Sequence, residues 1–282
     1  MAKQPLTITP VEAPVKQEAF DLITIIDDAF KHNEVTLQNG DVLALSSKYV
    51  AISEGRIVNL ADVTASSEAF EIAERFHMNP QMAQLVIQEA DHIFGGIPMG
   101  FLLTYKDGII SPNAGLDRSN IPSGQVVLFP EKPYHKAQEI REQIREKLGV
   151  DIGVILTDSW LMPGRIGTTG VALSTAGFKP VLDERGKIDL FGNPMQVTQR
   201  GIADSICAAA QLVMGETAES TPIAIVGNSG VELSNEPLGI EDVAIPWQMC
   251  IYVESLTLGI LPDGAPTESF TAKLPNPNMP TE

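Results

Sequence analysis

Residues 152–159 read IGVILTDS, and this stretch decides what kind of sheet the chain can build. The apolar residues 152–156 are typical of a strand that is buried on both faces of a sheet. The sequence predicts that this strand ends at Thr157, Asp158 and Ser159. A carboxylate beside a hydroxyl at the carboxyl end of a strand offers the hard oxygen ligands that Mg²⁺ or Mn²⁺ prefers. The alternative is that Asp158 or Ser159 only caps the element that follows.

Further helices and strands are predicted on both sides of this stretch. Apolar residues at helical spacing predict helices over residues 16–32, 66–77, 80–93, 134–148 and 200–214. Apolar runs predict strands over residues 42–46, 101–105, 125–129, 223–226 and 248–253. Glycine-containing stretches predict loops over residues 94–100 and 160–170. Because helices and strands do not alternate strictly, we expect an α+β or irregular α/β fold rather than a doubly wound sheet.

The charge of the chain limits the classes of partner that it can bind. Lys and Arg number 19 against 36 Asp and Glu, which gives a formal net charge of −17. Affinity for nucleic acid and for anionic membrane surfaces comes from Lys and Arg, so we expect neither partner. A small phosphorylated ligand stays possible, because metal ions held by the protein would supply the positive charge.

Several features bear on compartment and domain organisation. The first five residues lack the apolar segment of a signal peptide, and no apolar run approaches the ~20 residues that a membrane helix needs. Cys207 and Cys250 are predicted to be buried thiols rather than a disulfide, so we expect a cytoplasmic protein. We expect one domain over residues 1–261, with two subdomains, and a flexible proline-rich tail over residues 262–282.

Familiar nucleotide and zinc motifs do not occur in the sequence. There is no GxxxxGKS or GxxxxGKT phosphate loop, no GxGxxG after a strand, and no HExxH or CxxC pair. The four histidines fall on predicted helix ends or polar faces, where a solvated side chain is expected. The candidate site therefore depends on acidic, amide and hydroxyl side chains.

A polar stretch at residues 113–120, NAGLDRSN, follows the end of an apolar strand. Ligand-binding groups are often placed at such junctions, and Asp117 and Asn120 could both face one ligand. The alternative is an ordinary turn, because Asn, Gly, Asp and Ser are all turn residues.

Two later segments add candidates. The predicted loop 160–170 holds three glycines and Arg165, a composition that suits a loop that approaches phosphate, although any long irregular loop uses glycine. Gly215 is a plausible end for the helix over residues 200–214. That interpretation leaves Glu216 unexplained, and its carboxylate could be a further hard ligand.

In this order, these segments resemble the coenzyme F420-0:gamma-glutamyl ligase family. The resemblance covers residues 10–226. It rests on GDVL at 40–43, SEGR at 53–56, NAGLD at 113–117, SN at 119–120, TDS at 157–159, GKIDLFG at 186–192, VT at 197–198, AD at 203–204 and LVMGE at 212–216.

The resemblance implies a GTP-dependent amide ligase. In that family GTP phosphorylates a carboxylate of F420-0, and the amine of L-glutamate displaces phosphate from the acyl phosphate. The resemblance also implies Mg²⁺ or Mn²⁺, a monovalent cation such as K⁺, a homodimer, and an α+β fold of two intertwined α/β subdomains.

Site residues carry over from the family position by position. Asp117, Asp158 and Ser159 resemble the metal ligands, and Arg165 is the candidate catalytic cation. The positions that resemble nucleotide contacts are Glu12, Ser47, Asn120, Met214, Gly215 and Glu216.

The chain departs from the family pattern mainly where the family has cations. Ile52 stands where the family has a lysine, and Lys48 is the nearest lysine. The other departures are at Met162 and Ile166, at Gly227, and at Ala13 after Glu12. A hydrogen bond to a charged group contributes ~1.5–3 kcal/mol, so the loss of these cations affects which acidic substrate the site can bind. The expected substrate is F420-0 or a related carboxylate. The alternatives are a relative that binds a nucleotide or another phosphorylated ligand without ligation, and an oligomeric scaffold.

Overall fold

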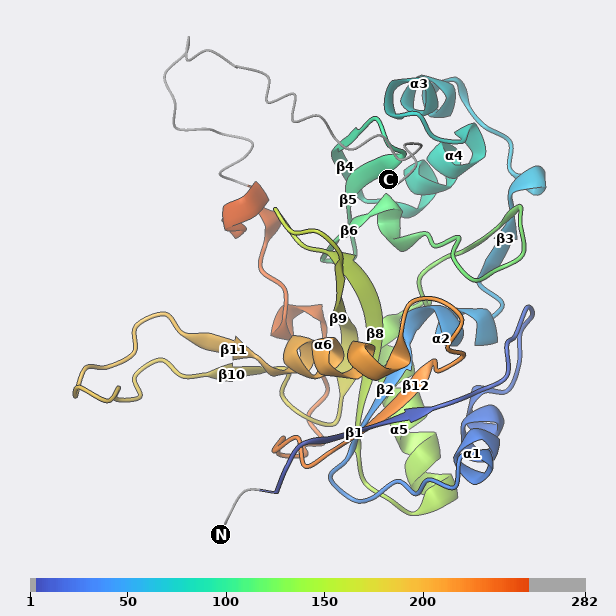
Figure 1. The fold of residues 1–282 in the computed structure, drawn as a ribbon. Coiled ribbons are helices and arrows are strands. Elements are labelled where there is room, and N and C mark those ends of the chain that lie inside the picture. Colours follow the sequence, from blue (N-terminus) through green and yellow to red (C-terminus); the bar gives the residue numbers. More distant parts are fainter. Residues whose placement is uncertain (1–3, 254–282) are drawn as a thin grey trace, which may run out of the picture. The chain divides into compact units, whose positions relative to one another are not determined.

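The computed structural model describes residues 4–253 as a mixed α/β protein (Figure 1). This bears out the coarse expectation of an α+β fold. The chain divides into a compact unit that ends at Ile245 and a second unit that begins at Pro246. The predicted tail over residues 262–282 lies outside the described residues.

A five-stranded sheet forms the centre of the first unit, in the order β1-β12-β2-β8-β9. The strand pair β2 and β8 is parallel, and the other neighbours are antiparallel. The carboxyl ends of β2 and β8 therefore lie at the same edge of the sheet, with Ser46 opposite Thr157. The bounds of the strands are Thr7–Val11 for β1, Ile223–Gly227 for β12, Val42–Ser46 for β2, Gly153–Leu161 for β8 and Thr168–Ala176 for β9.

Helices cover both faces of this sheet, as the uninterrupted apolar strands predict. Helices α1 (Leu22–His32) and α5 (Pro133–Leu148) pack on one face, where Leu43 and Leu156 are buried. Helix α6 (Ile202–Met214) packs on the other, with Ile155 buried between. Successive residues along β2, and likewise along β8, point alternately into the two cores, so these strands have no polar face.

A second group of elements packs around its own core. Strands β4 (His92–Ile97), β5 (Phe101–Lys106) and β6 (Ile109–Pro112) form an antiparallel sheet. Apolar residues of α4 and β5 share a buried cluster with β7, and α3 packs on α4. The remaining elements here are α3 (Ser67–Phe76), α4 (Pro80–Glu89), α2 (Ser47–Ser53), and the paired strands β3 (Ile57–Asn59) and β7 (Gln125–Val127).

The prediction of a helix to residue 93 followed by a loop was wrong. Helix α4 ends at Glu89, and β4 occupies residues 92–97 with a bulge between Ile93 and Gly95. A Cβ atom on Gly96 would lie 2.4 Å from the carbonyl oxygen of Phe101. The glycines therefore permit close strand pairing here, which a reading of glycine as a loop residue misses.

Three other boundaries also differ from the sequence prediction. Helix α1 begins only at Leu22, because the Asp21 carboxylate caps it by accepting from Thr24 N. Strand β8 continues to Leu161 and turns into β9, so most of the predicted loop 160–170 is a β-hairpin. Residues 248–253 form no strand but a 3₁₀ turn, Trp247–Met249, and a helical stretch at 251–253. Both cysteines are free, Cys207 buried and Cys250 only partly so.

A long two-stranded arm is built from β10 (Val181–Asp183) and β11 (Gln199–Gly201) and the segment between them (Figure 1). Leu190 and Phe191 in that segment are 100% and 89% exposed. Within residues 4–253, no helix combines the length and apolar character that crossing a membrane requires.

Candidate functional site

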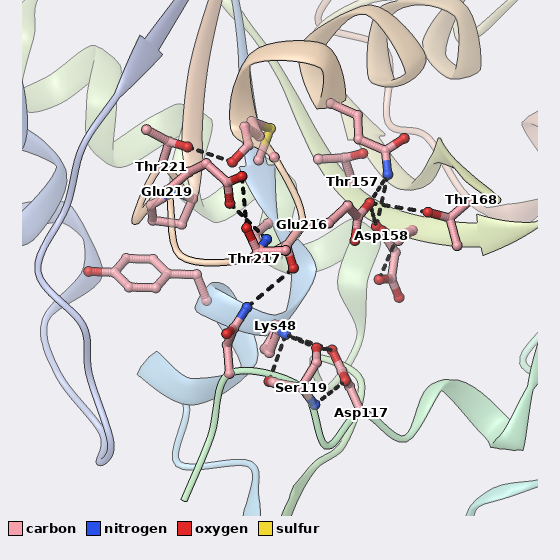
Figure 2. Close-up of a pocket in the computed structure, with 18 of the residues that line it drawn as sticks. Lys48, Asp117, Ser119, Thr157, Asp158, Thr168, Glu216, Thr217, Glu219 and Thr221 are labelled. Atoms are coloured by element: carbon pink, nitrogen blue, oxygen red, sulfur yellow. Dashed lines mark hydrogen bonds and ion pairs between the residues drawn. The ribbon is translucent and has the colours of Figure 1, made fainter. Parts of the chain in front are cut away.

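A cavity of about 640 Å³ opens at the edge of the central sheet where β2 ends and its pairing with β8 stops. Its walls come from segments that are far apart in the sequence: residues 13–16, the start of α2, residues 115–120, the outer half of β8, and the end of α6 with the loop that follows. Figure 2 shows polar side chains gathered around Asp117, around Glu216, and around Thr217 with Glu219.

Strand β8 delivers Asp158 and Ser159 to this cavity, but not by ending there. The pairing of β8 with β9 shifts register between Leu156 and Thr157, which marks a β-bulge. A bulge bends the strand and re-aims the side chains beyond it. Asp158 and Ser159 therefore reach the cavity from within a continuing strand, whereas the sequence predicted a strand end.

The segment before Asp117 is more than an ordinary turn. Asn113, Ala114 and Gly115 all have positive φ, and the Asn113 side chain accepts a hydrogen bond from Leu102 N. A Cβ atom on Gly115 would lie 2.1 Å from the Phe129 ring, so glycine is required there. Asp117 then exchanges two backbone hydrogen bonds with Val127 of β7, which fixes its backbone at the cavity wall.

Lys48 forms an ion pair with the Asp117 carboxylate. The Lys48 Nζ atom lies 2.7 Å from Asp117 Oδ2, and it also donates to Ser119 Oγ (2.7 Å) and to the Ser119 carbonyl oxygen (3.0 Å). Burial alone would raise the pKa of Asp117, but the Lys48 ammonium and the hydrogen bonds from Lys48 and Ser119 hold it below its ordinary value. The charge of the Asp117 carboxylate is therefore already balanced by the Lys48 ammonium.

Asp158 is in the opposite situation. Burial raises its pKa to about 7, and the nearby Asp117 carboxylate adds to the rise, against the Ser159 N–H, Lys48 and the Ser47 hydroxyl. Among the ion pairs formed by residues 4–253, none involves Asp158. A half-buried carboxylate without a cationic partner is costly, so this position favours a bound cation.

Glu216 joins the strand hairpin to the end of α6. Its Oε1 atom accepts from Ser159 Oγ at 2.5 Å and from Thr168 Oγ1 at 3.3 Å, and it also accepts from Gln211. The Glu216 carbonyl oxygen accepts from Asn120 Nδ2 at 3.4 Å, which ties this group to the Asp117 segment.

Most of the residues proposed from the sequence surround this cavity. It is lined by Asp117, Asn120, Asp158, Ser159, Met214, Gly215 and Glu216. Ser47 is buried and does not line the cavity, but its hydroxyl donates a hydrogen bond to the Asp158 carboxylate. Two candidates lie elsewhere. The Glu12 side chain is exposed while its backbone pairs with Asn33, and Arg165 is exposed in the turn between β8 and β9.

Sequence reasoning missed other polar residues of the cavity. Lys48, Thr168 and Gln211 were not among the candidates, although each bonds one of the acidic residues there. A signal for Lys48 did exist. It follows β2 by two residues, and β2 is parallel to the strand that carries Asp158.

The donor set fits a hard divalent cation in its chemistry. Two carboxylates, a hydroxyl and the Glu216 carboxylate are oxygen ligands of the kind that Mg²⁺ and Mn²⁺ prefer. In the described part of the chain, no three acidic, histidine or cysteine side chains already converge on one point. The present bonds of Asp117 and Glu216 explain this, because both carboxylates are turned to protein donors.

The fold and the cavity together define a mixed α/β protein with an acidic, hydroxyl-rich cavity at the edge of its central sheet. The chain belongs to the F420-0:Gamma-glutamyl ligase family, whose sequence profile matches residues 10–228. This confirms the family resemblance of the motifs.

Curated relatives match most of the same region. The chain is 38% identical over 189 residues to the coenzyme F420:L-glutamate ligase of Methanopyrus kandleri, which is 67% of this chain and 75% of that protein. It is 35% identical over 213 residues to the enzyme of that name from Methanosarcina mazei, with 76% and 82% covered. The Archaeoglobus fulgidus enzyme is 34% identical over 220 residues, with 78% and 86% covered.

Proposed function

We propose that this protein is a GTP- and metal-dependent ligase that adds L-glutamate to F420-0 through an acyl phosphate. The observation that carries the proposal is the convergence of Asp117, Asp158, Ser159 and Glu216 on one cavity, in a chain of this family. In the reaction, the γ-phosphoryl group moves from GTP to a carboxylate oxygen and GDP leaves. The glutamate amine then forms the C–N bond as the C–O bond to phosphate breaks, and the amine proton is released.

Asp117, Asp158 and Ser159 would hold Mg²⁺ or Mn²⁺, with Glu216 as a further oxygen ligand. When bound, such ions neutralise charge that develops on the phosphoryl oxygens. We propose that K⁺ assists the reaction, and we assign no residues to its binding. The chain's own contribution is to orient these ligands: Ser47 and the Ser159 N–H hold the Asp158 carboxylate, and Gln211 holds Glu216.

Asn120, Met214 and Gly215 form the wall on which we place the nucleotide. The Asn120 side chain and the Glu216 backbone are already linked, so this part of the wall is held in place before any ligand binds. Gly215 ends α6 with φ of 72° and ψ of −176°, a combination that requires glycine. We keep Arg165 and Glu12 as candidates that reach the ligand only if their segments move, since neither lines the cavity.

Part of the cavity wall is apolar and would suit an apolar part of the acceptor. It is lined by Phe101, Leu116, Phe129, Trp160 and Leu161. The Trp160 indole is held by a hydrogen bond of 3.1 Å to the carbonyl oxygen of Ile110, which joins β8 to β6. An aromatic wall in the same cavity would pack against an apolar part of the acceptor.

We further propose that the protein is a homodimer and that the β10–β11 arm contacts the second copy. The arm tip is ordered by Asp189, whose carboxylate accepts from Phe191 N and Asn193 N at 2.8 Å, so the apolar tip is preformed. Residues 181–201 carry three acidic and three basic side chains, whereas the whole chain has a net charge of −17. A neutral arm lets two acidic copies approach without strong repulsion. Phe191→Asp should shift the mass measured by light scattering from dimer to monomer; a monomeric wild type would contradict the proposal.

The ligase proposal is tested by incubating the protein with GTP, Mn²⁺, K⁺, L-glutamate and F420-0. We expect GDP release that requires both substrates, and a product heavier by one glutamyl residue in mass spectrometry. The competing function is nucleotide binding without ligation, which the scarcity of cations in the cavity favours. Tight GTP binding with no GDP release under these conditions would support that alternative.

A further inference from the structure

Lys48 is paired with the Asp117 carboxylate, which the proposed function assigns to a divalent ion. Lys48 would therefore have to move when that ion binds. We propose that Lys48 is an exchangeable counter-ion: it neutralises Asp117 while the site is free of metal, is displaced when a divalent ion binds Asp117, and then contacts the phosphates of the nucleotide. The inference deepens the proposed function and rests on it for the metal and the phosphorylated ligand.

The first step of the argument concerns the lone pairs of Asp117. Its Oδ1 atom accepts from Ser119 N at 2.7 Å, and its Oδ2 atom accepts from Lys48 Nζ at 2.7 Å and from Ser119 Oγ at 3.1 Å. Each carboxylate oxygen has two acceptor positions, so Oδ2 is saturated. A cation that uses Oδ2 must displace a donor, and the ammonium of Lys48 is the donor that it repels.

The second step is that Lys48 is able to leave. Its side chain is 21% exposed and lines the cavity, so its Nζ atom has open space beside it. The remaining partners of that Nζ atom are both on Ser119, in the same turn as Asp117. An ammonium on a flexible four-carbon stem can move without a change in the backbone of α2.

The third step identifies what Lys48 would bind once it is displaced. The cationic side chains that line the cavity, among described residues, are Lys16 and Lys48, against four acidic ones. Lys16 lies over the Phe20 ring, 5.5 Å from its centroid. Lys48 is therefore the cation nearest the metal ligands, and lysine ammonium groups commonly bind phosphate as point charges.

The pairing with Asp117 and the contact with phosphate predict opposite effects of a Lys48 substitution on the affinities for Mn²⁺ and for nucleotide. A purely structural role for Lys48 predicts no such opposition. Without nucleotide, Lys48→Met should bind Mn²⁺ roughly tenfold more tightly than wild type, because a competing charge is gone. In saturating Mn²⁺, the same variant should bind a non-hydrolysable GTP analogue roughly tenfold more weakly, because a phosphate contact is lost. Mn²⁺ binding is followed by the EPR signal of the free ion, and analogue binding by calorimetry.

Lys16→Met is the matched control. It removes the same charge from the same cavity but leaves the Lys48–Asp117 pair intact. We expect it to change Mn²⁺ affinity by less than about threefold, since only screened long-range repulsion is lost. Lys48→Gln is measured beside Lys48→Met, so that a failure of one variant to fold leaves the test in place.

The outcomes separate this inference from the function beneath it. If wild type binds Mn²⁺ and Lys48→Met or Lys48→Gln binds it equally or more weakly, the exchange is wrong while the metal site stands. Equal tightening in Lys16→Met would also overturn the exchange, because the effect would be general electrostatics. If wild type binds no Mn²⁺ with or without the analogue, the metal assignment itself fails and the exchange fails with it.

Discussion

Asp117 and Asp158 line the same cavity, yet the protein treats the two carboxyl groups in opposite ways. Asp117 lies on a loop, where the Lys48 ammonium and the backbone N–H and hydroxyl of Ser119 contact its carboxylate, and its pKa is lowered. Asp158 sits on a strand between two cores, and burial raises its pKa to about 7. The comparison teaches that a pair of acidic residues in one site need not be equivalent before the ligand binds. One is neutralised by Lys48, and the other forms no ion pair among the described residues.

The largest expected effect is the loss of metal-dependent nucleotide binding when either carboxylate is replaced. Asp117→Asn and Asp158→Asn should each weaken Mn²⁺-dependent binding of a GTP analogue by at least about 100-fold, because a charged metal ligand is replaced by a neutral one. Calorimetry in saturating Mn²⁺ measures this, with circular dichroism to verify folding. Unchanged affinity in either folded variant would remove that residue from the metal set.

The second prediction separates the two residues through the stability of the metal-free protein. At pH 8 with EDTA, Asp158→Asn should raise the free energy of unfolding by about 1 kcal/mol, because a half-buried, unpaired charge is removed. Asp117→Asn should lower it by about 1 kcal/mol, because Lys48 then loses its ionic partner. In thermal melts these changes correspond to shifts of ~2–4 °C of opposite sign.

Added Mn²⁺ supplies the control for this pair. An ion that binds only the folded state stabilises it by mass action, so wild type should gain stability while both variants gain little. Two stability changes of the same sign in EDTA would mean that the carboxyl groups are not distinguished as the structure indicates.

Local patterns were enough to predict much of this site. The apolar run before Asp158, the polar stretch around Asp117 and the helix end before Glu216 are each visible within ten residues of sequence. The structure brings all three to one cavity: α6 packs on the sheet that carries Asp158, and the pairing of Asp117 with Val127 places the polar stretch at the cavity wall. The residues assigned through the family alone gave a mixed result: Met214 lines the cavity, whereas Glu12 does not.

The features of the site that the sequence did not predict depend on contacts between residues far apart in the chain. The Lys48–Asp117 contact joins residues 69 positions apart, and no local pattern pairs them. The bulge after Leu156 is set by the partner strand β9, so a strand that continues through Asp158 looked like a strand that ends. The apolar residues 248–253 suit a strand or a helix equally, and the structure makes them helical.

The smallest expected effect compares the two serines that support the carboxylates. Ser119→Ala removes an acceptor of the Lys48 ammonium, so Lys48 should be displaced more easily and Mn²⁺ should bind about threefold more tightly without nucleotide. Ser159→Ala removes a candidate metal ligand and a donor to Glu216, so Mn²⁺ should bind about threefold to tenfold more weakly. The same hydroxyl deletion thus has opposite signs on the two sides of one cavity. EPR titration of free Mn²⁺ resolves changes of this size. Weaker binding in both variants would mean that Ser119 acts by positioning Asp117 rather than by retaining Lys48.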